Sequence, residues 1–264
     1  MARKKAIRKT SRRRASKTLK ASARIKRAAN KSAARAAKGA PPRRVIRARK
    51  PASRPGDRLV LYGLHFSLPS CKVGLMLSLC GAKFDYKHVD LMAGENKRPE
   101  FLAKNRFGQV PVLQDGATFL CQSNVILQYL ADKYGKFGGR TPGERLRVAE
   151  WLAWDLDRMA SGLGFARAAT RFWRQEPPVM DFFRARGEQA LATLDRQLGA
   201  SKFIAGPLPT IADVAVFPWV ATADEGGFDI ARYPNVRDWA ERMLKLPGAA
   251  HPYAIMPKED RVAA

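Results

Sequence analysis

The hydrophobic pattern begins with short apolar runs of the kind that form strands. An apolar run at residues 59–63 ends in glycine and predicts a buried strand. From Cys71 to Gly81 the apolar residues recur every three or four positions, which predicts a helix that ends at the glycine. Residues 84–89 predict a second strand, parallel to the first because a helix connects the two.

The next segment completes a small α/β unit. A short helical segment follows Pro99, and residues 110–121 predict two strands joined at the turn-forming pair Asp115-Gly116. A further helix ends at Gly135. The predicted order of elements is βαβαββα.

Beyond Glu144 the strand patterns disappear. The windows 144–173 and 183–200 have helical periodicity, and Thr210 and Asp213 have the spacing of a capping box at a helix start. The predicted fold class is therefore α/β plus all-α, with an α/β domain followed by an all-helical one.

Charge separates a third region from these two. Residues 1–56 hold 22 of the 49 Lys and Arg residues and no acidic residue, whereas the other 27 basic residues are nearly balanced by all 23 acidic ones. Too few large apolar residues lie in this tail to offset the entropy of folding, so it is predicted to be disordered. The predicted domains are a basic tail with a proline-containing linker at 1–56, the α/β domain at 57–137 and the helical domain at 143–264.

Three interpretations of the tail stay open. A flexible, strongly basic segment suits non-specific binding to nucleic-acid phosphates. Organelle transit peptides are also rich in Arg and Ser and poor in acidic residues. The third interpretation is a dispensable extension.

Other features exclude whole classes of protein. No apolar run approaches the roughly 18 residues of a membrane span, so no membrane partner is expected. Cys71, Cys80 and Cys121 form no CxxC pair and no disulfide framework, which favours a reducing compartment such as the cytoplasm. Cysteine and histidine also lack the spacing of a zinc site, so no metal is predicted.

Four segments resemble, in order and spacing, the glutathione transferase superfamily. They are residues 61–73, 93–116, 121–135 and 209–248, and the second is similar to the phi class and related bacterial enzymes. The resemblance implies a thioredoxin-like N-terminal domain, a helical C-terminal domain, a homodimer and a role in detoxification. It also implies glutathione as co-substrate, bound between the domains, with no further cofactor.

The resemblance and the residue chemistry give candidate contacts to glutathione. In the family the proline that matches Pro111 is cis, which would turn the backbone of Val110 outward to pair with the ligand's cysteinyl main chain. An ordinary edge or turn proline is the alternative. Gln122 and Ser123 precede a helix, where N–H groups and the helix dipole favour a carboxylate. Ser123 would contact the γ-glutamyl carboxylate and Gln122 the amine, unless the pair is only a helix cap.

The other carboxylate of glutathione has two candidate donors. Lys97 matches the lysine of the phi-class GEHK motif, which meets the glycine carboxylate, while Asn96 replaces the histidine of that motif. Gln109 is the second candidate. A lysine in a charged loop is otherwise simply solvated.

Ser67 is the candidate catalytic residue. It follows the first strand at the spacing at which serine-type members of the family place their catalytic hydroxyl. Its role would be to donate a hydrogen bond to the thiolate, helped by a helix that begins near Cys71. The alternative for Ser67 is an ordinary turn serine. Cys71 itself is either a reactive thiol with a lowered pKa or a buried, inert residue.

The sequence thus predicts a glutathione S-transferase that activates the thiol for attack on an electrophile, or for reduction of a peroxide or disulfide. Two alternatives stay open: a non-catalytic scaffold tethered to nucleic acid by the tail, and a disulfide-exchange enzyme that uses Cys71. Arg167 and Arg171 are available to attract an anionic acceptor. The aromatic candidates for the acceptor pocket are Trp151, Trp154, Phe165, Phe172 and Trp173.

Overall fold

The computed structural model describes residues 58–262, so the predictions for the basic tail lie outside the described residues. A four-stranded mixed sheet forms the first half of this part of the chain, with strand order β2-β1-β3-β4. β1 is parallel to β2 and antiparallel to β3, which forms an antiparallel hairpin with β4. The strands are β1 (Leu59–Gly63), β2 (Phe84–His88), β3 (Val112–Asp115) and β4 (Thr118–Cys121).

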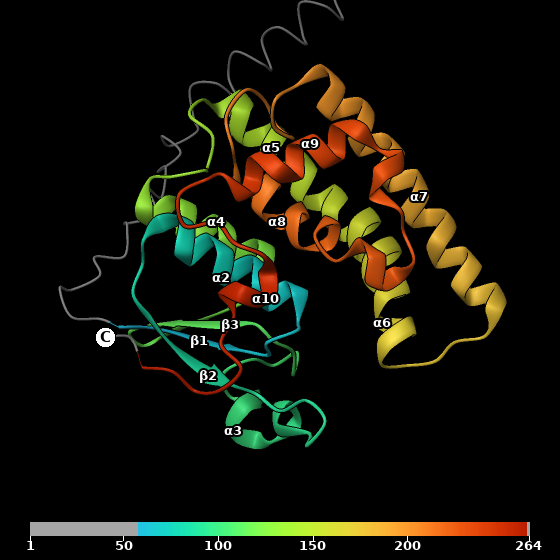
Figure 1. Ribbon diagram of the computed structural model, residues 1–264. Helices are drawn as coiled ribbons and strands as arrows, with labels where there is room; N and C mark the ends of the chain where they lie inside the picture. Colours follow the sequence, from blue (N-terminus) through green and yellow to red (C-terminus); the bar gives the residue numbers. More distant parts are fainter. Residues whose placement is uncertain (1–57, 263–264) are drawn as a thin grey trace, which may run out of the picture. The chain divides into compact units, whose positions relative to one another are not determined.

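Two helices, α2 (Leu68–Cys80) and α4 (Ser123–Tyr134), cover one face of this sheet, and the short α3 (Pro99–Leu102) lies on the other side (Figure 1). The predicted order βαβαββα is confirmed, and the domain is thioredoxin-like. One boundary was wrong. Helix α2 begins at Leu68 rather than near Cys71, because Ser67 is its N-cap and a proline occupies its first turn.

The rest of the described chain is helical, as predicted. A nearly continuous run starts with α5 (Pro142–Trp154), continues as the π-helix η2 (Asp155–Gly164) and ends with α6 (Phe165–Arg171). The remaining α-helices are α7 (Pro177–Ala200), α8 (Ile211–Val220), α9 (Pro234–Leu244) and α10 (Pro252–Ile255), and short 3-10 turns lie at η1 (Glu95–Lys97), η3 (Ala223–Gly226) and η4 (Ile230–Arg232).

Helix α8 lies at the centre of the helical half, and all of its residues are buried. Thr210 and Asp213 form the predicted capping box at its start. The long α7 packs against η2 where two glycines meet: a Cβ on Gly162 would lie 2.7 Å from the backbone nitrogen of Gly187. Only glycines allow these two helices to approach so closely.

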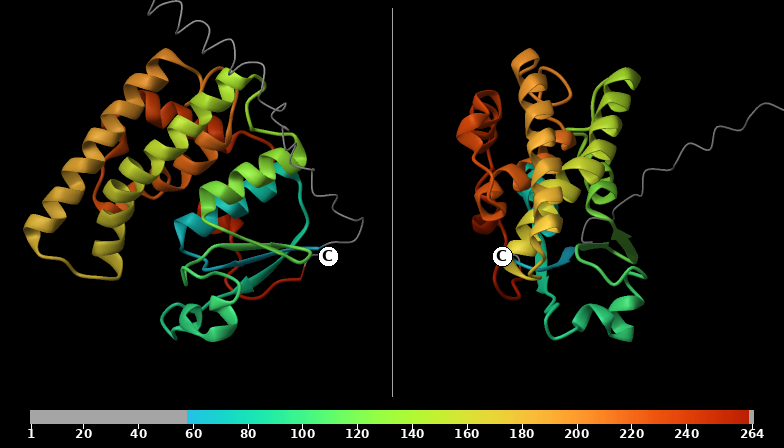
Figure 2. Two further views of the ribbon diagram at one scale, coloured as in Figure 1. Left: turned by 180° about the vertical axis from the view of Figure 1, so that it is seen from behind. Right: turned by 90° about the vertical axis from the view of Figure 1, so that its right-hand side faces the viewer.

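The two halves share one hydrophobic core. Side chains of the sheet, of α2 and α4 and of the helical half belong to a single buried cluster. Figure 2 shows α2 and α4 between the sheet and the long helices. No helix among residues 58–262 is long and apolar enough to cross a membrane.

The C-terminal segment returns to the α/β half. Met256, just after α10, packs onto Gly74 of α2, where a Cβ would lie 2.6 Å from its sulfur. Arg261 then exchanges two backbone hydrogen bonds with Tyr86 of β2, at 2.7 and 3.0 Å. These bonds cover part of an edge strand that would otherwise expose unpaired backbone groups.

Candidate functional site

A cavity of about 860 Å³ lies between the α/β half and the helical half. The α/β half contributes the loops after β1 and β2, the segment before β3 and the start of α4. The helical half contributes η2, α6 and the segment after it. Six of the seven predicted site residues line this cavity: Ser67, Gln109, Val110, Pro111, Gln122 and Ser123.

Ser67 lies at the N-terminus of α2, where the hydroxyl oxygen accepts a long hydrogen bond of 3.4 Å from the backbone N–H of Ser70. The hydroxyl hydrogen has no acceptor among the described residues, so it is free to be donated to a ligand. The positive end of the α2 dipole points to the same place. Ser67 therefore combines a free donor with a local field that favours an anion.

Val110 lies two residues before β3, and the Val110-Pro111 peptide bond is cis. Within the described part of the chain neither the N–H nor the C=O of Val110 has a hydrogen-bond partner. The neighbouring carbonyl of Gln109, by contrast, accepts from the side-chain amide of Asn105 at 2.6 Å. Asn105 thus holds the segment in place while Val110 offers one donor and one acceptor to the cavity.

Gln122 and Ser123 form the junction between β4 and α4. Gln122 has a φ of 67° and a ψ of 112°, a conformation that is costly for any residue other than glycine. Ser123 is 7% exposed and is the first residue of the helix. Its hydroxyl has no partner among the described residues, and the unpaired N–H groups of the first turn lie beside it. This corner suits a carboxylate.

Lys97 is the predicted site residue that does not line the cavity. Its side chain is exposed and its Nζ lies beside Gly108, which does line it. Asn96, in the position where the resemblance expects histidine, lines the cavity and donates to the carbonyl of Gly108 at 2.7 Å. Lys97 thus lies at the rim of the cavity, and its long side chain can reach a ligand there.

The cavity floor contains an ion pair that the sequence analysis missed. Lys72 donates to Asp155 at 2.6 Å, and the two side chains are 1% and 0% exposed. Asp155 also accepts from the indole of Trp219 at 2.8 Å and from Asn124 at 3.0 Å. The signal was present in the sequence, since Lys72 is the one charged residue in the apolar helix α2.

This network ties four elements together. Lys72 comes from α2, Asn124 from the first turn of α4, Asp155 from η2 and Trp219 from α8. Lys72 and Trp219 line the cavity, and the ammonium lies 4.7 Å from the centre of the indole ring. Burial lowers the pKa of Lys72, against the opposing effect of Asp155. The network therefore holds the N-terminal ends of α2 and α4, which carry Ser67 and Ser123, in place against the helical half.

Arg167 connects the other wall of the cavity to Ser67. Its guanidinium donates to Glu225 at 2.7 Å, to the hydroxyl of Tyr253 at 2.5 Å and to the backbone carbonyl of Phe66 at 3.3 Å. Tyr253 in turn donates to Glu225 at 2.7 Å. Sequence reasoning singled out Arg167 but not Glu225 or Tyr253, which lie more than fifty residues away along the chain.

Cys71 is fully buried, and burial raises the pKa of its thiol to about 12. Its sulfur lies 3.5 Å from the carbonyl of His65 and does not line the cavity. These observations favour the inert interpretation of Cys71 over the reactive one. Within residues 58–262 no three His, Cys, Asp or Glu side chains are grouped as a metal site requires.

Comparisons with known proteins agree with this architecture. Residues 58–132 match the family model "Glutathione S-transferase, N-terminal domain", and residues 167–242 match "Glutathione S-transferase, C-terminal domain". The chain is 31% identical over 186 residues to the disulfide-bond oxidoreductase YfcG of Escherichia coli. This match covers 66% of this chain and 85% of that protein.

Solved structures give the same result. A glutathione S-transferase from Pseudomonas fluorescens is 31% identical, with a TM-score of 0.70 over 74% of this chain and 98% of the other. A second family member from that organism, solved with two glutathione molecules bound, is 25% identical, with a TM-score of 0.66 over 73% of this chain and 90% of the other. Both halves of the described fold are thus found together in these proteins, and the chain belongs to the glutathione S-transferase family.

Proposed function

We propose that the protein binds glutathione in the cavity and activates its thiol for transfer to a second substrate. The observation that carries the proposal is the convergence of three kinds of receptor on one cavity of about 860 Å³. Ser67 offers a free hydroxyl donor, Val110 offers unpaired backbone groups, and Ser123 offers a helix N-terminus. A thiol, a peptide and a carboxylate require these three receptors.

In the proposed complex the γ-glutamyl carboxylate lies at Ser123, with its amine at Gln122. The cysteinyl main chain pairs with Val110, next to Pro111. Gln109 and Lys97 supply donors for the glycine carboxylate from the rim. The sulfur then reaches Ser67.

Ser67 stabilises the thiolate by donating its hydroxyl hydrogen to the sulfur. Lowering a thiol pKa by about 2 units requires about 2.7 kcal/mol, which one charge-assisted hydrogen bond and a helix dipole can supply. The proton of the thiol passes to solvent. The sulfur attacks an electrophilic carbon, a C–S bond forms, and the leaving group departs with its bonding electron pair.

A second reaction of the same thiolate is favoured by the similarity to a disulfide-bond oxidoreductase. The bound thiolate would attack a disulfide, form a mixed disulfide and release one thiolate. A second glutathione would then release the other thiol and leave oxidised glutathione. The thiol in this reaction is that of glutathione, since Cys71 is buried and has a raised pKa.

Substitution of Ser67 tests the proposal. Ser67→Ala should retain glutathione binding at millimolar affinity or tighter, measured by calorimetry. It should lower turnover and raise the pH at which the bound thiol ionises, followed by the ultraviolet absorbance of the thiolate. Ser70→Ala is a matched control, because Ser70 lies one helical turn away and does not line the cavity.

Two results would contradict the proposal. The first is the absence of glutathione binding at tens of millimolar, which would favour a non-catalytic scaffold. The second is a wild-type rate in Ser67→Ala together with loss of activity in Cys71→Ser, which would make Cys71 the reactive thiol.

A further inference from the structure

The wall of the cavity that α6 and the residues after it form is aromatic. Phe165, Phe172 and Trp173 line it and are 45%, 43% and 50% exposed. Large aromatic side chains exposed side by side around a cavity usually mark a binding surface. This wall, formed by α6 and the residues after it, is therefore the surface available to the second substrate.

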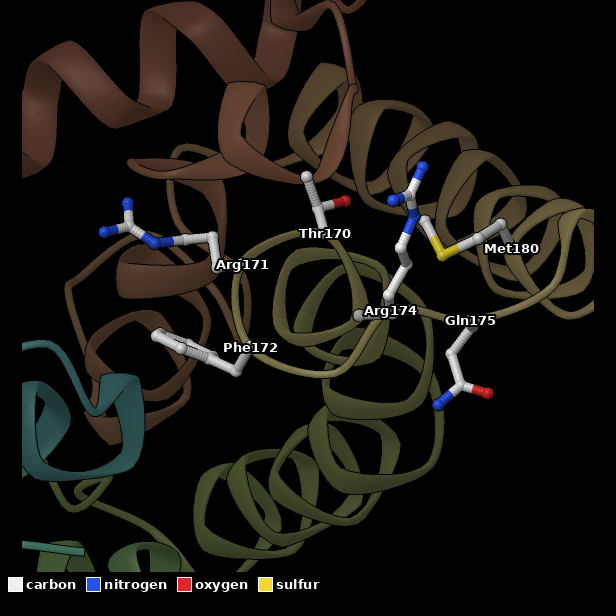
Figure 3. Close-up of a pocket in the computed structure, with 7 residues that line it drawn as sticks. Thr170, Arg171, Phe172, Arg174, Gln175 and Met180 are labelled. Atoms are coloured by element: carbon white, nitrogen blue, oxygen red, sulfur yellow. The ribbon is translucent and has the colours of Figure 1, made fainter. Parts of the chain in front are cut away.

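Three arginines accompany these rings. Arg167 is 5% exposed and lines the cavity, while Arg171 and Arg174 line an adjoining hollow of about 490 Å³. Phe172 lines both spaces. Figure 3 shows Arg171 beside Phe172, and Arg174 with Gln175 and Met180 across the hollow.

Negative charge on this wall does not balance the three arginines. Arg167 and Arg171 share one carboxylate, each donating to the same oxygen of Glu225 at 2.7 Å. Arg174 has no ion-pair or hydrogen-bond partner within residues 58–262. The residues that line the two spaces here, counted together with Glu225, therefore carry two guanidinium charges in excess, next to exposed aromatic rings.

The other carboxylate at the cavity, that of Asp90, is hydrogen-bonded within its own loop. Among the described residues that line the two spaces, Asp90 is the only acidic one, and it lies in the segment after β2 with Leu91 and Met92. One of its oxygens accepts the backbone N–H groups of Met92 and Ala93 at 2.8 and 2.9 Å. Asp90 thus belongs to the α/β half and does not neutralise the arginines of the aromatic wall.

The aromatic wall also contacts the segment that carries Ser67, as an acceptor site should. Arg167 donates to the carbonyl of Phe66, the residue before Ser67, and the ring of Phe66 stacks on Phe172 at 5.3 Å between centroids. A molecule that lies against Phe172 is therefore close to a sulfur held by Ser67.

We propose that the second substrate is an aromatic molecule with an acidic group, whose ring packs against Phe165, Phe172 and Trp173 while its acid is attracted by the positive charges of Arg171 and Arg174. The inference rests on the proposed function, because it names the substrate class of that same site. Carboxylates and sulfonates meet guanidinium groups through paired hydrogen bonds, which gives orientation as well as attraction.

A matched pair of electrophiles tests the charge requirement. Para-chloro-meta-nitrobenzoate and the corresponding benzamide have the same reacting carbon, but only the first is an anion. With either one the thiolate attacks the carbon that bears chlorine, a C–S bond forms, chloride leaves with the bonding pair, and the thiol proton passes to solvent. Each kcat/KM is divided by the uncatalysed rate of the same compound.

The benzoate should be preferred severalfold, and salt should weaken the preference, because exposed charges are screened. In Arg171→Gln/Arg174→Gln the benzoate-to-benzamide ratio should fall about twofold to fivefold, the range expected for exposed charge pairs. Arg232→Gln is the control, since Arg232 is exposed but lines neither space. An equal rate for both compounds, or an unchanged ratio in the double variant, would overturn the inference.

Binding without turnover separates this inference from the proposed function. Calorimetry with the unreactive meta-nitrobenzoate and meta-nitrobenzamide requires no glutathione chemistry. A preference for the benzoate that is lost in the double variant would support the anionic subsite even if glutathione were not used. No preference for the benzoate in this binding experiment would reject the subsite, whatever the outcome for glutathione.

Discussion

At the scale of single residues, the ion pair of Lys72 and Asp155 is distinguished by its burial, since the two side chains are 1% and 0% exposed. Removing two charges from water is costly, and the Coulomb attraction compensates for that cost only if the remaining donors and acceptors are also paired. Asp155 meets this condition, because it accepts from Lys72, Trp219 and Asn124. Loss of one partner would leave a charge buried without compensation.

Lys72→Met should therefore lower the free energy of unfolding by about 3–5 kcal/mol, measured by urea denaturation. Because methionine fills a similar volume, the loss of unfolding free energy measures the cost of leaving the carboxylate of Asp155 without its ion-pair partner. The double variant Lys72→Met/Asp155→Leu should recover only part of it, because Trp219 and Asn124 then lose their buried acceptor. Lys87→Met, which breaks the exposed pair with Asp260, should have a much smaller effect. Equal effects of Lys72→Met and Lys87→Met would show that burial does not set the cost.

Cys71 gives a second prediction at this scale, and it concerns pH. With its pKa raised to about 12 by burial, only about one thiol in ten thousand is ionised at a pH four units lower. Iodoacetamide reacts with the thiolate, so labelling of native Cys71 should be negligible at mildly alkaline pH and should rise with pH toward 12. The half-buried Cys80 and Cys121 should be labelled first, as read by mass spectrometry. Rapid labelling of Cys71 near neutral pH would revive its reactive interpretation.

At the scale of elements, two helices carry the same start signal in different surroundings. Thr141 and Glu144 form a capping box at the exposed start of α5, and Thr210 and Asp213 form one at the buried start of α8. Asp213 also accepts from the backbone N–H of Ile204 and from the indole of Trp239, both at 2.9 Å. The second box therefore joins three segments, whereas the first organises only its own helix.

Asp213→Ala should lower the free energy of unfolding by more than about 3 kcal/mol, because several buried donors lose their acceptor at once. Glu144→Ala should shift the urea midpoint far less, since water can reach the groups that it caps. Comparison of the two midpoints in otherwise identical chains is the measurement. A midpoint shift in Glu144→Ala as large as that in Asp213→Ala would mean that the motif, and not its burial, determines the effect.

Patterns within one element were predictable from the sequence, and contacts between distant elements were not. The strand at 59–63, the hairpin at Asp115-Gly116 and the helix stops at Gly81 and Gly135 follow from local turn and capping chemistry. The π-helical conformation of 155–164 leaves no comparable local signal.

The same distinction holds for the candidate site. Ser67, Val110 and Ser123, which the resemblance singled out, line one cavity, and each lies at the end of a predictable element. Asp155 and Glu225 were missed, since their roles depend on packing between helices far apart in the chain. Residues at element ends can be inferred from sequence, but their tertiary partners require the structure.

At the scale of the whole molecule, charge is distributed very unevenly. The 56 N-terminal residues carry 22 of the 49 basic residues and no acidic one, while the remaining 208 are nearly balanced. The candidate glutathione site lies entirely within the second part. Binding of polyanions and chemistry on glutathione should therefore be separable functions of one chain.

Removal of residues 1–56 should abolish binding to nucleic acid and leave glutathione affinity nearly unchanged. Binding by the full chain should be independent of sequence, because Lys and Arg side chains contact phosphates without an ordered reading of bases. If about 8 phosphates are engaged, the logarithm of the association constant should fall with that of the salt concentration with a slope near −7. Fluorescence anisotropy with duplexes of unrelated sequence, over a range of salt, measures both properties, and calorimetry on the shortened chain measures glutathione. A slope near zero for the full chain would exclude the polyanion role, and recovery of a chain cleaved near Pro55 from an organelle would favour the transit peptide.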